Sequence, residues 1–175
     1  MVLWAERVAV GAGRDLDGVD GVEPLSRSGD WQFGHVLGNF SQSMEDLVEA
    51  VTRRLDAPAI GFYVADSDAA AIYFAGPNSR VGWLALNHSY DDSDDEHTEQ
   101  WLDPDRHREA AAALAAWAAA YAPRKPSEDE ILAALEARID PRLSADVGGR
   151  AMVFAEDGVE VIFNELLGIG SIHAE

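Results

Sequence analysis

The chain has 175 residues, of which 47% are hydrophobic and 26% are charged, enough for one compact domain with its own core. Acidic residues outnumber basic ones by 32 to 13, and the formal net charge of -19 argues against binding to nucleic acids because it repels phosphate backbones. The absence of cysteine excludes disulfides, thiol catalysis and thiolate metal sites.

The N-terminal residues carry an acid early and lack the basic-then-apolar layout of a secretion signal. No apolar run approaches the roughly 18–20 residues that a membrane span requires. We therefore expect residues 1–175 to form a single soluble, cytoplasmic globular domain that does not contact a membrane.

The first expected element is a strand over residues 2–10, which are rich in strand-forming residues. Residues 11–42 contain seven glycines and one proline, and this density of turn residues predicts a long loop, with room for a short strand near 31–33. A loop of this length is typical of a functional or mobile segment.

A helix is expected to begin at Ser43, because Asp46 follows three residues later in the arrangement of a capping box, and to end before Pro58. Three short strands follow at about 59–66, 69–75 and 80–87. Short links of turn residues join them, which predicts an antiparallel meander.

Asp103 and Pro104 have the sequence of a helix N-terminus, and the alanine-rich stretch after them predicts a helix to about residue 122. Ser127 and Glu130 form a second capping box at the start of a helix that runs to about residue 139. Two further strands, 150–155 and 159–165, are expected to form a C-terminal hairpin through the Glu156-Asp157-Gly158 turn. The fold class is therefore α+β: a mainly antiparallel sheet, with a central three-stranded meander and a C-terminal hairpin, and about three helices.

The most distinctive stretch is acidic: residues 91–105 hold eight acids and no lysine or arginine. Carboxylates packed this closely repel one another, so we expect residues 89–100 to form no regular, core-packed element. A basic protein could dock here, steered by the carboxylates and anchored by the neighbouring tryptophan. The predicted partner-binding residues are Asp91, Asp92, Asp94, Asp95, Glu96, Glu99 and Trp101.

A second hypothesis comes from residues 29–40, where aromatic and polar side chains alternate with glycines. A small-ligand-binding or enzymatic domain could use this glycine-rich loop as a lid, with Trp31, His35 and Asn39 lining the ligand. The two hypotheses belong to different classes and both remain open at this point.

No other pattern indicates chemistry. The five histidines include no closely spaced ligand pair, the Gly-x-Ser-x-Gly pattern is absent, and no complete nucleotide-binding or calcium-loop pattern occurs, so we predict no catalytic residue, no metal and no cofactor. The profile (small, acidic, cysteine-free, α+β) is similar to that of many immunity proteins that neutralise basic toxins, a likeness of composition that covers no specific motif. The leading hypothesis is a non-catalytic acidic protein that binds a basic partner, with an immunity-type inhibitor as one form of it.

Overall fold

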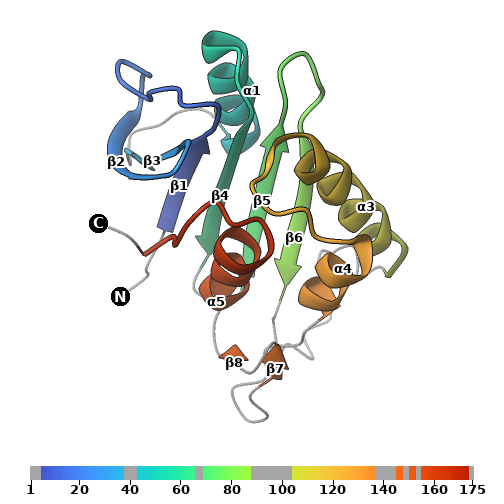
Figure 1. The fold of residues 1–175 in the computed structure, drawn as a ribbon. Coiled ribbons are helices and arrows are strands. Elements are labelled where there is room, and N and C mark those ends of the chain that lie inside the picture. The colour runs from blue at the N-terminus through green and yellow to red at the C-terminus, as the bar shows by residue number, and fades with distance from the viewer. Residues whose placement is uncertain are drawn as a thin grey trace.

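A six-stranded antiparallel sheet forms the centre of the computed structural model, which describes residues 5–37, 43–65, 69–87, 104–136, 145–147, 150–152 and 155–173 (Figure 1). Across the sheet the strands are β2 (Val22–Ser28), β3 (Trp31–Val36), β1 (Ala5–Val10), β4 (Ala59–Ala65), β5 (Ala69–Ala75) and β6 (Gly82–Asn87). The expected meander is present as β4, β5 and β6, paired in order along the chain. The α+β fold class predicted from the sequence is confirmed.

Helices cover both faces of this sheet (Figure 1). The helical elements are α1 (Met44–Leu55), α3 (Pro104–Tyr121), α4 (Glu128–Glu136) and α5 (Ala155–Glu160), which continues into a π-helical turn η1 (Val161–Leu166). α1 packs on one face, α3 and α5 pack on the other, and α4 packs against α3 and η1. A small separate hairpin consists of β7 (Ala145–Val147) and β8 (Arg150–Met152). None of the helices in the described ranges is both long and apolar enough to span a bilayer.

The two faces of the sheet have separate cores because side chains alternate along each strand. On β4, Ile60, Phe62 and Val64 point to the face covered by α3 and α5, whereas Ala59 points to the face covered by α1. We call these the α3–α5 face and the α1 face. Along β4, buried side chains therefore alternate between the two cores.

Both capping boxes predicted from the sequence are confirmed. The Ser43 Oγ accepts a hydrogen bond from the Asp46 N–H at 3.2 Å, and the Asp46 carboxylate accepts one from the Ser43 N–H at 3.3 Å. Before α4, the Glu130 carboxylate accepts a hydrogen bond from the Ser127 N–H at 2.8 Å and another from its hydroxyl at 2.9 Å. These bonds hold the pKa of Glu130 below its ordinary value, with the backbone bond as the main cause.

The long loop predicted for residues 11–42 was wrong, because β2 and β3 form a hairpin within it. The short strand expected near 31–33 is present as part of β3. The glycines make tight turns: Gly13, Gly18, Gly21 and Gly29 all have positive φ angles. Gly29 and Asp30 make the two-residue turn between the paired residues Ser28 and Trp31. Pro24 is tolerated because β2 is an edge strand, with a register shift between Pro24 and Arg27.

The C-terminal hairpin predicted for residues 150–155 and 159–165 was also wrong. Residues 155–166 are helical, and Gly158, the expected turn residue, is buried inside α5. Ala155, Val159, Ile162 and Phe163 recur at helical spacing and are all buried in the α3–α5 core. Burial of this helical face outweighs the strand preference of the β-branched residues.

Candidate functional site

The acidic segment singled out from the sequence lies outside the described residues. This applies to Asp91, Asp92, Asp94, Asp95, Glu96, Glu99 and Trp101, and also to the expectation about residues 89–100. The elements that flank the segment are described: β6 leads into it at Asn87, and α3 follows it from Pro104.

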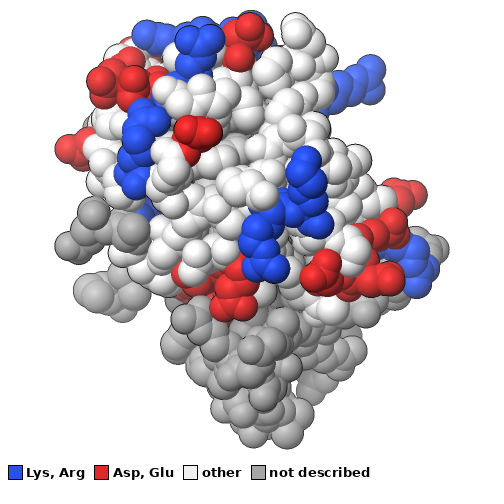
Figure 2. Space-filling model, in the orientation of Figure 1, with Lys and Arg blue, Asp and Glu red and all other residues white. Residues whose placement is uncertain are grey.

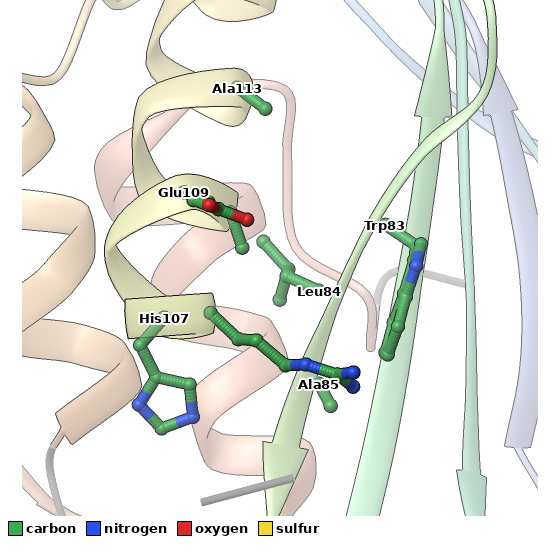
Figure 3. A pocket seen from close by; sticks show the side chains of 8 residues that line it. Trp83, Leu84, Ala85, His107, Glu109 and Ala113 are labelled. Carbon is green, nitrogen blue, oxygen red and sulfur yellow. The ribbon is translucent and has the colours of Figure 1, made fainter. Parts of the chain in front are cut away.

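A hollow of about 430 Å³ lies between these two flanking elements (Figure 3). We call it the edge hollow. It is lined by Trp83, Leu84 and Ala85 from β6 and by Arg106, His107, Glu109, Ala110 and Ala113 from α3. Because β6 is the last strand of the sheet, its outer edge pairs with no strand in the described part of the chain. The hollow therefore combines an open sheet edge with a helix face.

Trp83 is the most exposed large hydrophobic residue that the structure describes, at 47%. Leu84 and Leu86 point into the α3–α5 core, so alternation along β6 turns Trp83 away from that core. A large aromatic side chain at the border of a hollow has the composition and position of an interface anchor.

The charges around the edge hollow are mixed. Arg106 and His107 line it together with Glu109. Figure 2 likewise shows basic and acidic side chains interspersed with uncharged surface over the visible part of the described structure. The densest run of acids is the stretch 91–105, most of which is undescribed.

A second hollow, of about 710 Å³, lies at the end of the sheet where β1 and β5 end. We call it the loop-end hollow. Residues from six places in the chain line it: Ala12; Ser28, Gly29, Asp30 and Trp31; Asp56 and Pro58; Pro77; Ala120, Tyr121, Ala122 and Pro123; and Gly168. It contains two carboxylates and two aromatic side chains, and none of the described residues that line it is a lysine or arginine.

The residues of the ligand-binding hypothesis are only partly described. Trp31 is 2% exposed and packs against Trp117, with ring centroids 5.8 Å apart, at the loop-end hollow. His35 is exposed and lies four residues along β3, roughly 13 Å away at the rise of an extended strand. Asn39 lies outside the described residues. The structure therefore separates Trp31 from His35, and the proposed role of Asn39 remains a prediction.

Glu160 is a charged residue that the sequence analysis did not single out. It is only 6% exposed, and its carboxylate accepts hydrogen bonds from the Ile172 N–H at 2.8 Å, the Ser171 hydroxyl at 3.2 Å and the Asn164 amide at 3.0 Å. These contacts fasten the C-terminal segment to α5. Within the described ranges, no three His, Asp or Glu side chains are grouped so that they could hold a metal ion.

No protein-family model, curated protein or solved structure matches the chain.

The sequence analysis did not single out Trp83 and Tyr121, the exposed aromatic residues of the two hollows, as site residues. A signal for Trp83 existed: between residues 82 and 87 it is out of phase with Leu84 and Leu86, as expected for an aromatic side chain turned away from the main core. Tyr121 could be placed only with the packing of α3 in hand.

Proposed function

We propose that this protein is a non-catalytic binding protein for a basic protein partner, and that it acts as an inhibitor of the immunity type. The observation that carries the proposal is the exposed Trp83 beside the edge hollow, next in the chain to the most acidic segment.

Electrostatics supports the choice of a basic partner. A net charge of -19 attracts cationic proteins at long range, before any direct contact forms, and raises their association rate at low salt. The run of acids in 91–105 concentrates negative charge in the part of the chain that joins β6 to α3.

The edge hollow supports an anchoring role. Trp83 offers a large apolar surface, and no strand in the described part of the chain pairs with the outer edge of β6, where a partner strand could pair. Since charge mainly sets the association rate and buried aromatic contacts mainly set the lifetime of a complex, the two features have separate effects on binding.

The experiment is affinity capture from the source organism with the purified full chain as bait, at low and at high salt. Three variants accompany the native chain: Trp83→Ala; a neutralised segment with Asp91→Asn, Asp92→Asn, Asp94→Asn and Asp95→Asn; and a control with Asp17→Asn, Asp20→Asn, Glu23→Gln and Glu45→Gln. The control removes the same number of negative charges from exposed positions elsewhere.

The expected result is a basic protein that is captured by the native chain and the control at low salt. Kinetic measurements on the purified pair should then show slower association for the neutralised segment and faster dissociation for Trp83→Ala. Capture that is equal for all four baits, or a captured protein that is not basic, would contradict the proposal.

A further inference from the structure

We infer that the loop-end hollow binds a cationic side chain, a guanidinium or an ammonium group, presented by the basic partner. The inference rests on the proposed function and gives it a second, chemically defined contact outside the acidic segment.

Two carboxylates from separate turns line this hollow. Asp30 lies in the turn between β2 and β3, where its carbonyl accepts a hydrogen bond from the Gly13 N–H at 2.9 Å. Asp56 caps the C-terminus of α1 in a left-handed conformation, with φ at 47°. The backbone at both positions is thus fixed by turn contacts. Both side chains are exposed, and neither carboxylate forms an ion pair with any residue that the structure describes.

An aromatic ring lines the same hollow. Tyr121 is 37% exposed, and its inner side packs against Trp117, with ring centroids 6.0 Å apart. Trp117 in turn contacts Trp31 and Phe74, so the tyrosine is the outermost ring of a buried aromatic cluster. Gly76 lies directly against the ring, where any Cβ would overlap it. A ring held in this way is a preformed surface for a cation, which the face of an aromatic ring attracts.

None of the basic residues in the described part of the chain lines the hollow. The nearest basic residues along α3 and its following turn are Arg124 and Lys125. The side chain of Arg124 lies against Gly168 at the border of the hollow, but Arg124 and Lys125 donate hydrogen bonds to the carbonyls of Glu165 and Ala119. The edge hollow differs in this respect, because Arg106 and His107 line it. Charge complementarity therefore assigns a cationic side chain to the loop-end hollow rather than to the edge hollow.

Both hollows are within reach of one partner. Ala113 on α3 lines the edge hollow and Ala120 lines the loop-end hollow, and seven residues of α-helix span about 10 Å. The volume of about 710 Å³ is in the range of sites that enclose small ligands. It leaves room for a side chain together with part of the segment that carries it.

The test uses a small probe that does not require the partner to be known. N-acetyl-arginine amide is titrated into the full-length ¹⁵N-labelled protein, and N-acetyl-citrulline amide, which has nearly the same shape without the charge, is titrated in parallel. We expect the arginine probe to shift the amide signals of Gly29, Tyr121 and Gly168 in a saturable way, and the citrulline probe to leave them nearly unchanged.

Matched variants locate the binding. Asp30→Asn with Asp56→Asn, and separately Tyr121→Ala, should weaken the arginine probe at least about tenfold. Asp17→Asn with Asp20→Asn removes the same charge outside the hollow and should leave binding within about twofold. Spectra of the free variants verify that each is folded.

The outcomes separate this inference from the proposed function. Shifts that are absent, that follow citrulline equally, or that persist in the Asp30/Asp56 variant overturn the cation site, whatever the capture experiment shows. A captured basic partner that binds the Asp30/Asp56 variant as tightly as the native chain also overturns it, and leaves the proposed function standing.

Discussion

The two faces of the central sheet are packed in different ways. The α3–α5 face is rich in aromatic rings: Trp31, Phe33, Phe62, Phe74, Trp117 and Phe163 are all buried there. The core of the α1 face consists mainly of valine, leucine and alanine, with Tyr63 and Tyr73 partly buried at its border. Strands β1, β3, β4 and β5 supply buried residues to both faces, so on these strands the difference lies in which residues alternate to each side.

This difference sets how close the helices lie to the sheet. On the α1 face, Gly61 has no side chain, and α1 approaches so closely that a Cβ there would be 2.6 Å from the Met44 Sδ and 3.0 Å from the Val48 Cγ2. On the opposite face, contacts pass through rings such as Phe62 and Phe163, whose centroids are 5.3 Å apart in an edge-to-face arrangement. Packing on the α3–α5 face therefore depends on large rings that fill the space between helix and sheet. Packing on the α1 face depends on the absence of a side chain at Gly61.

The largest effect is expected from Phe163→Ala. Phe163 is 1% exposed and contacts both Phe33 and Phe62, so its removal leaves a cavity in the aromatic core. We expect a loss of about 3–5 kcal/mol in the free energy of unfolding, measured by chemical denaturation. Trp83→Ala is the control, with an expected change within about 0.5 kcal/mol because this side chain is half-exposed. Equal losses for the two variants would contradict this description of the core.

Gly61→Ala examines the α1 face. The added methyl group would collide with α1, and we expect a loss of about 1–3 kcal/mol in the free energy of unfolding. Combining it with Met44→Ala should recover part of this loss, since the double variant provides space for the new methyl group. If Gly61→Ala instead stabilised the protein, as glycine replacement does at unstrained, open positions, the close approach of α1 would be disproved.

Glu160→Gln examines how the C-terminal segment is fastened over the α3–α5 face. Glutamine keeps one acceptor oxygen, so at least one of the three donors loses its partner. We expect a loss of about 1–2 kcal/mol in the free energy of unfolding, and faster hydrogen exchange at the Ile172 amide. Unchanged exchange at this amide together with an unchanged free energy of unfolding would show that the carboxylate does not hold the segment.

The smallest effect concerns the pH dependence on the α1 face. Burial raises the pKa of Tyr73 above its ordinary value of 10.0, with smaller contributions from Tyr63 and Glu45. Below about pH 10 the phenol is protonated in both the folded and the unfolded chain, so stability does not change with pH through this group. Above this pH the unfolded chain loses the proton first, and stability falls until the pH passes the raised pKa of the folded state.

Tyr73→Phe should therefore make stability less dependent on pH above 10. Glu45→Gln should lower the pKa of Tyr73 toward its ordinary value, as followed by the ultraviolet absorbance of tyrosinate. A titration of Tyr73 that is identical with and without Glu45 would contradict the proposed electrostatic contact.

Local signals allowed much of the fold to be predicted from the sequence. The capping residues Ser43 and Ser127 placed the starts of α1 and α4, and short turns placed the meander of β4 to β6. The failures occurred where a local signal had two readings. Gly29 was assigned to a long loop, but it lies in the tight turn of the hairpin between β2 and β3. Gly158 was assigned to a turn, but it lies inside α5.

The candidate site could be predicted only in part. Charge and the acidic run were visible in composition, but the hollows join residues distant in sequence, such as Asp30, Asp56 and Tyr121. No local pattern connects these three residues, because their proximity depends on the order of strands in the sheet and on the end point of α3. Such a site emerges only when the chain is folded.

The unequal edges of the sheet have a consequence for self-association. At one edge, β2 contains Pro24, which cannot donate a backbone hydrogen bond, and a register shift that interrupts regular pairing. At the other edge, β6 is uninterrupted by proline. A strand added at β6 would find regularly spaced backbone hydrogen-bonding groups. If a second copy of this protein paired through its own β6, the β2 edges of both copies would remain exposed, and a third copy would have to pair with one of these irregular edges. The irregular β2 edge thus disfavours further strand pairing and limits edge-to-edge growth into fibres.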